Sequence, residues 1–176
     1  MPFTPYHFGP AALLALPAKK YIDIPTFVFA NVAVDLEPLT VILLPLNYPL
    51  HGFCHTLLIG TAVGLLWGLL AYFIKDIFKW PMQFFQLPCK TCISKMLLSG
   101  ILGVWLHIIF DSTLYRDIRP LWPSNANPLF RIIKPSSVYL ICEIACIAAV
   151  VIFPARAFCL YRRQKSQIHK VGNIKD

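Results

Sequence analysis

Long apolar segments constrain the fold of this chain more than any other feature of its sequence. Residues 55–74 (HTLLIGTAVGLLWGLLAYFI) carry no charged side chain, and the segments 96–114 and 138–158 carry only three between them. A helix needs about 20 apolar residues to cross the hydrocarbon core of a bilayer. Of the 176 residues, 57% are hydrophobic and 14% are charged, whereas about 25% of residues are charged in a soluble domain. The sequence therefore predicts an all-α integral membrane protein.

A further apolar segment, residues 24–50, precedes these three and is interrupted by Pro25, Pro38, Pro45 and Pro49. We expect a kinked or discontinuous span with Asp35 and Glu37 at the break, because irregular backbone at membrane depth is tolerated where it lines a cavity or is buried in protein. The predicted architecture is a small polytopic helical bundle with about four spans, the first broken by prolines. Residues 1–158 form its membrane-embedded domain, and residues 159–176 form a basic cytoplasmic tail.

Small residues recur every four positions in the segment 55–74, at Gly60, Gly64 and Gly68. This spacing places them on one face of a helix, where they let a second helix approach closely. We therefore expect tight packing between this span and a neighbour.

Basic residues indicate the orientation of the chain in the membrane. Twelve lie before the first span, between the second and third, or after the last. The other four are Arg116, Arg119, Arg131 and Lys134. By the positive-inside rule, this distribution predicts an inner-membrane protein with a cytoplasmic N-terminus and tail. Topology also explains the net charge of +8, so a nucleic-acid partner is not expected.

Histidines and carboxylates converge at the end of the bundle that this topology places on the non-cytoplasmic side. His51 and His55 stand where the second span begins, and the third span returns to that side carrying His107 and Asp111. Residues four apart share one helical face, with Cβ atoms about 5–6 Å apart. Ionisable groups at membrane depth are costly and mark functional sites. With the acids of the first span, and with His7 if the N-terminal segment folds back, the candidate metal ligands are His7, Asp35, Glu37, His51, His55, His107 and Asp111.

Imidazole and carboxylate ligands suit zinc, with manganese and iron as alternatives. The candidates outnumber the three or four ligands that one catalytic zinc needs. Some could orient the ligating imidazoles, or two ions could lie about 3.5–4 Å apart with Asp111 or Asp35 as the bridge. We favour two ions. A purely structural alternative is a polar pair of His107 and Asp111 that holds helices together.

The motifs that carry these residues resemble those of one family. HGFCHT (residues 51–56) is similar to the HRGxTHS-type motif of the YdjM-like predicted membrane-bound metal-dependent hydrolases, and VDLE (34–37) to their PDxD element. The segment beginning LHIIFD resembles their HxxxD helix, and His7 falls where they carry an early histidine. The likeness covers roughly residues 1–130. The chain departs from the pattern at Val34, Glu37, Gly52 and Thr56.

The resemblance implies a metal-dependent hydrolase of unassigned substrate. A distant likeness to zinc-dependent phospholipase C-type enzymes makes a phosphoester the first expectation. A metal-activated water would attack the ester, with Glu37 or Asp35 accepting its proton. Arg116 and Arg119 would bind a phosphate or carboxylate of an amphiphilic substrate such as a membrane lipid. The alternative is that both arginines snorkel to lipid headgroups.

The same residues bear on three functions other than hydrolysis. An intramembrane metalloprotease is disfavoured, because HGFCH lacks the glutamate that follows the first histidine of HExxH. A haem anchor with His55 and His107 as axial ligands would leave the carboxylates without a role. Non-catalytic metal binding or transport stays open. The pair Cys89 and Cys92 is a weak zinc signal without a second CxxC.

Overall fold

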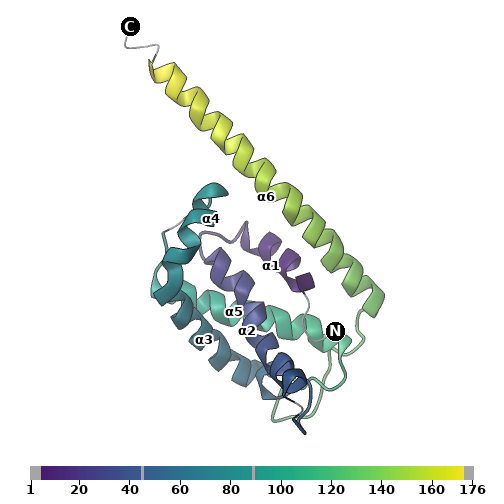
Figure 1. Cartoon of the computed structure of the whole chain (residues 1–176). Coiled ribbons are helices and arrows are strands. Elements are labelled where there is room, and N and C mark those ends of the chain that lie inside the picture. The colour runs from purple at the N-terminus through teal and green to yellow at the C-terminus, as the bar shows by residue number, and fades with distance from the viewer. Residues whose placement is uncertain (1–4, 45, 89, 173–176) are drawn as a thin grey trace.

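Four helices of the computed structural model are long and apolar enough to cross a membrane. The structure describes residues 5–44, 46–88 and 90–172, which contain helices and no strand (Figure 1). The four candidate spans are α2 (Ile24–Leu43), α3 (Leu57–Ile74) continued to Phe84, α5 (Ile93–Leu114) and α6 (Pro135–Gly172). The prediction of an all-α bundle with about four spans is confirmed, and the chain has the helices of an integral membrane protein.

Short helices complete the architecture. They are η1 (Pro5–His7), α1 (Phe8–Ala15), η2 (Phe53–His55), η3 (Lys75–Phe78) and α4 (Lys79–Phe84). The chain reverses at two ends of the bundle. We call the end formed by residues 46–56 and 115–134 the loop end. The opposite end, which carries Lys19, Lys20, Lys75, Lys79, Lys90 and Lys95, is the lysine end.

The first span is not broken at Asp35 and Glu37, so this expectation was wrong. Helix α2 is continuous through Asp35, Glu37 and Pro38 and ends at Leu43, with non-helical residues from 46 onward. A proline inside a helix removes one hydrogen bond, whereas ending the helix at membrane depth would leave several backbone groups unpaired. The acids therefore project from a regular helix and not from a break. Pro45 lies outside the described residues.

Helices α3 and α5 pack closely, as the glycine spacing predicts. A Cβ atom added at Gly64 would lie 2.7 Å from Cα of Ile101 and 2.8 Å from the carbonyl oxygen of Gly100. A side chain there would force the two helices apart. Because α5 carries His107 and Asp111, while His55 lies just before α3, this contact sets the separation of the histidines.

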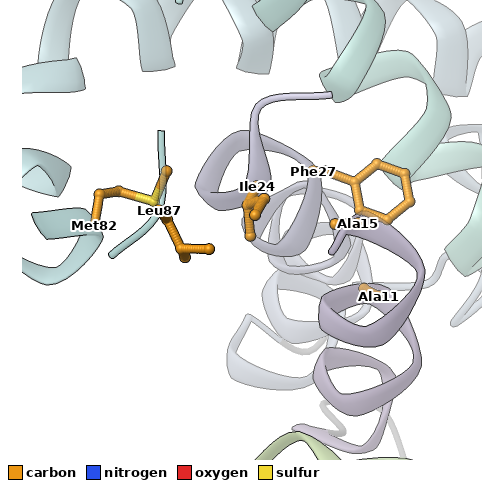
Figure 2. Packing of buried hydrophobic residues seen from close by; sticks show 6 residues of the cluster. All are labelled: Ala11, Ala15, Ile24, Phe27, Met82 and Leu87. Atoms are coloured by element: carbon orange, nitrogen blue, oxygen red, sulfur yellow. The ribbon is translucent and has the colours of Figure 1, made fainter. Parts of the chain in front are cut away.

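Helix α1 enters the bundle without crossing it. Its eight residues span about 12 Å, much less than the roughly 30 Å of a hydrocarbon core. It lies between α2 and α6, and the Cα hydrogens of Gly9 face the backbone of Cys146 in α6. Buried apolar side chains of α1, the start of α2 and the α4 region form one cluster. Figure 2 shows Met82 and Leu87 on the same side of Ile24. This packing brings the N-terminal segment to the loop end, where Tyr6 meets Tyr139 edge-on at 6.2 Å.

Hydrogen bonds fix the chain at both ends. At the loop end, the N–H of Leu57 donates to the carbonyl of Pro120 over 3.0 Å, and the Asn127 amide donates to the carbonyls of Ser112 and Tyr115. At the lysine end, Nζ of Lys95 donates to the carbonyl of Lys19 over 2.8 Å. Helix α6 continues without interruption past Phe158, where we expected the basic tail to begin, and extends beyond the bundle (Figure 1).

Candidate metal centre

Four of the seven predicted ligands meet at one point inside the bundle. One ligand atom from each of Asp35, His55, His107 and Asp111 lies within 4.8 Å of every other, and all four residues are buried. Asp35 comes from α2, His55 from η2, and His107 and Asp111 from successive turns of α5. Three segments far apart in sequence thus place two imidazoles and two carboxylates around one small volume.

The separations around His107 fit a metal site. Its Nε2 lies 3.2 Å from Oδ1 of Asp35 and 3.3 Å from Oδ2 of Asp111. Ligands that bind zinc tetrahedrally at about 2.0–2.1 Å lie roughly 3.3 Å from one another. Within the described residues, neither ring nitrogen of His107 meets the geometry of a hydrogen bond. The two contacts of Nε2 have the separations of ion pairs with Asp35 and Asp111, and the same separations suit three ligand atoms around one cation.

Glu37 holds the imidazole of His55 through the ring nitrogen Nδ1. Its Nδ1 lies 2.9 Å from Oε2 of Glu37, while its Nε2 is buried and has no hydrogen-bond partner in the described chain. Glu37 also accepts the backbone N–H groups of Gly52 over 3.1 Å and Cys54 over 3.2 Å. Its carboxylate therefore fixes the loop and orients the imidazole, as the outer partners of metal-binding histidines do.

The protonation of His55 suits metal binding. Burial lowers the pKa of its imidazole below the ordinary value, against the opposing effect of the Glu37 carboxylate. The ring is therefore neutral at pH 7, which is the form that ligates metals. Burial and the nearby Glu37 charge raise the pKa of the neighbouring Cys54 thiol to about 11. That thiol does not belong to the four-residue group.

His7 lies beside the group, next to both Asp111 and His107. Its Nε2 is 3.0 Å from Oδ1 of Asp111, and its ring centroid is 4.6 Å from that of His107. Asp111 thus directs one oxygen to each histidine, which is the geometry of a bridging or shared carboxylate. The fold-back of the N-terminal segment that the sequence suggested brings His7 here, where it is only 4% exposed.

His51 occupies the other flank of the group and has a partner that the sequence reading missed. Its Nδ1 lies 2.9 Å from Oδ2 of Asp117, and its ring centroid is 4.9 Å from that of His55. Asp117 is the single acidic residue of the loop 115–134. Because that loop follows the HxxxD helix at the loop end, a lone acid within it was the available signal.

A pocket of about 600 Å³ opens beside His51. Both predicted substrate-binding arginines line it, Arg116 and Arg119, together with the aromatic rings of Phe53 and Trp122. Nη1 of Arg119 donates to Oδ1 of Asn125 over 3.0 Å, which holds the guanidinium at the pocket. The pocket thus joins cationic and aromatic side chains to the edge of the histidine group.

Other residues singled out from the sequence lie elsewhere. Glu143 is exposed on α6, and Cys92 is exposed before α5; Cys89 lies outside the described residues. The haem alternative is disfavoured by the geometry. The carboxylate oxygens 3.2 and 3.3 Å from Nε2 of His107 occupy the space that a porphyrin ring would need beside an axial ligand.

Comparisons with known proteins add no further assignment. No protein-family model, curated protein or solved structure matches this chain. The function must therefore be argued from the site and from the motifs in the sequence.

Proposed function

We propose that the protein is a membrane-embedded metal-dependent hydrolase that cleaves a phosphoester of an amphiphilic substrate. The observation that carries the proposal is the convergence of Asp35, His55, His107 and Asp111 on one buried point. The resemblance of HGFCHT, VDLE and the HxxxD helix to the YdjM-like hydrolases supports the same class. A non-catalytic metal-binding protein is the alternative.

Two imidazole nitrogens and two carboxylate oxygens form a donor set that suits zinc, and also manganese or iron. Nε2 of His55 is buried without a hydrogen-bond partner in the described chain, and Nε2 of His107 lies between oxygens of Asp35 and Asp111, which supports all four residues as ligands. We propose one ion at this point, in place of the two that we favoured from the sequence, because four of the seven candidate ligands converge on it. When bound, a divalent cation supplies Lewis-acid chemistry, which lowers the pKa of water toward about 7.

The two candidate general bases, Glu37 and Asp35, differ in the contacts that their carboxylate oxygens already make. Both oxygens of Glu37 accept hydrogen bonds, from Gly52 and His55 on one and from Cys54 on the other. That carboxylate is therefore proposed as a positioning residue. Asp35 approaches His107 with Oδ1, and its second oxygen is proposed to accept the proton of the attacking water.

The pocket beside His51 is the proposed binding site of the substrate. Guanidinium groups bind phosphate oxygens in pairs, so Arg116 and Arg119 suit the anionic part of the ester. Phe53 and Trp122 offer apolar contact to the rest of the molecule. Since the pocket lies where the spans end, a lipid or lipid-like ester could enter it from the bilayer surface. We place this surface on the non-cytoplasmic side of the inner membrane, according to the distribution of basic residues.

Hydrolysis assays on purified protein test the proposal. The chain in detergent micelles is stripped with chelator, reloaded with zinc, manganese or iron(II), and offered phosphomonoesters, phosphodiesters and carboxyl esters with short and long alkyl chains. We expect activity on a phosphoester, restored by metal and lost in Asp35→Asn. A reloaded protein that retains metal and hydrolyses none of these esters would favour the non-catalytic alternative.

A further inference from the structure

We propose that the lysine end holds a second binding site, which takes an anionic phospholipid as a structural partner. Its headgroup would lie against Lys75, Lys79 and Lys90, and an acyl chain would occupy an apolar groove between α1, α2, α4 and α6. The two halves of this site are adjoining cavities. The proposal does not depend on the metal centre, which lies at the opposite end of the bundle.

The headgroup half is a cavity of about 380 Å³ in the turn between α3 and α5. Lys75, Lys79 and Lys90 line it, and so does the carboxylate of Asp23. That carboxylate already accepts hydrogen bonds from the backbone N–H and the hydroxyl of Thr26, where it caps α2. The cavity therefore presents three ammonium groups against one carboxylate that is engaged elsewhere.

Two of these lysines make weak contacts that a ligand can replace. Nζ of Lys79 lies 2.9 Å from Oδ1 of Asp76, but both side chains are more than half exposed, and an exposed pair of this kind contributes little. Nζ of Lys75 lies over the ring of Tyr72 at 3.9 Å from the centroid. Neither contact removes the ammonium group from the cavity.

The acyl half is a groove of about 500 Å³ whose lining is almost entirely apolar. Side chains of α1, α2, the α4 region and α6 form its walls, among them Phe8, Phe29, Phe85 and Phe153. Pro25, Phe78 and Met82 line both this groove and the lysine cavity. The two spaces therefore adjoin at these residues, and in the proposal one elongated molecule extends over both.

The lysine cavity and the apolar groove differ in chemistry, and together they favour a phospholipid over a soluble anion or a peptide. A small soluble anion would use the lysine cavity and leave the groove unfilled. A peptide would bring backbone N–H and carbonyl groups into a groove that offers them almost no partners. A phospholipid matches both halves, since lysines near a membrane surface attract anionic headgroups. Trp80 of α4, next in sequence to the cavity residue Lys79, is 74% exposed, as expected for a tryptophan at a membrane interface.

Native mass spectrometry of the full chain in detergent tests the site. The protein is titrated with phosphatidylglycerol or phosphatidylcholine bearing the same acyl chains. We expect one phosphatidylglycerol to bind with an affinity roughly fivefold or more above that of phosphatidylcholine, the effect expected of even one lysine near a lipid headgroup. Inorganic phosphate at millimolar concentration should not displace it, because phosphate lacks the acyl chain.

Two variant sets locate the binding. The triple variant Lys75→Gln, Lys79→Gln, Lys90→Gln should lose the preference for phosphatidylglycerol. The triple variant Lys20→Gln, Lys134→Gln, Lys165→Gln, with the same change of charge on exposed lysines that line neither cavity, should keep it. Ala149→Trp should weaken both lipids by filling the groove, whereas Val151→Trp, at a side chain that is 60% exposed and outside the groove lining, should not.

Three results would overturn the proposal. The first is an equal preference for phosphatidylglycerol in the two lysine triple variants. The others are displacement of the lipid by phosphate alone and unchanged lipid binding in Ala149→Trp. Lys79 and Lys90 are exposed and Lys75 is half-buried, so the lysine triples are expected to fold, and their comparison remains valid if Ala149→Trp does not fold. Binding of lipid is measured without reference to metal or hydrolysis, so failure here leaves the proposed function untouched.

Discussion

Nδ1 of His55 lies 2.9 Å from Oε2 of Glu37, and this contact joins the candidate metal centre to the loop that precedes α3. The same carboxylate accepts the N–H groups of Gly52 and Cys54. Glu37 therefore sets the position of His55 and the conformation of the segment that carries it. The free Nε2 of His55 faces the other three members of the group as a result.

Replacement of Glu37 tests this positioning role. Glu37→Gln keeps the size of the side chain and removes the charge that holds Nδ1 protonated and Nε2 available. We expect metal affinity to fall by about 10- to 100-fold, the usual effect of losing the outer partner of a ligating histidine. Chelator competition measures the affinity. Glu143→Gln, at an exposed position of α6, is the matched control, and equal affinities in the two variants would contradict the role.

The variant Asp117→Asn tests whether His51 acts as a metal ligand or only lines the substrate pocket. Asp117 pairs with His51, which is not among the four convergent residues. We expect metal content to stay at the wild-type level while kcat/KM for the phosphoester falls by about tenfold or more, because His51 lines the proposed substrate pocket and a misplaced side chain there disturbs the position of the substrate. Elemental analysis and steady-state kinetics on one preparation give both values. Loss of metal would instead make His51 a ligand; Asp76→Asn is the charge control.

Arg119→Lys tests the pocket. Lysine keeps the positive charge but loses the paired donors that match a phosphate. Loss of one charge-assisted hydrogen bond costs about 1.5 kcal/mol, so we expect KM to rise roughly tenfold with kcat nearly unchanged. Arg131→Lys, in the same loop but outside the pocket lining, should leave KM unaltered. A fall in kcat without a change in KM would argue against a role in substrate binding.

Gly64→Leu tests the contact between α3 and α5. Because Gly64 faces the backbone of Gly100 and Ile101, the added side chain must separate the helices. We expect the free energy of unfolding in mixed micelles to fall by about 1–3 kcal/mol, as for other overpacked interiors. Ala62→Leu adds a larger side chain to an exposed position of α3 and should change it little. Equal stability of the two variants would show that the contact is not close.

Spacing was enough to predict the parts of the site that lie on regular helices. The four-residue interval between His107 and Asp111 places both on one face of α5 in any helical structure. The length of the apolar segments then requires the third span to return to the end where His51 and His55 stand. Local pattern and membrane thickness together thus limit where these side chains can go.

Contacts made by irregular segments could not be predicted in this way. Asp117 meets His51 across 66 positions of sequence, through a loop whose path no periodicity describes. The continuity of α2 through Pro38 follows from burial at membrane depth, which overrides the local preference of proline. We propose Asp35 as the general base and Glu37 as a positioning residue because the loop directs backbone N–H groups to Glu37. Sequence alone does not show which carboxylate receives these N–H groups.

The metal content of the purified protein tests the central claim most directly. Elemental mass spectrometry is applied to the detergent-purified wild type and to the double variant His55→Ala, His107→Ala, with circular dichroism to confirm that both are folded. We predict about one equivalent of zinc, manganese or iron per wild-type chain, as four ligands imply, and none in the variant. A folded wild type that stays metal-free after reconstitution with each of these ions would contradict the account.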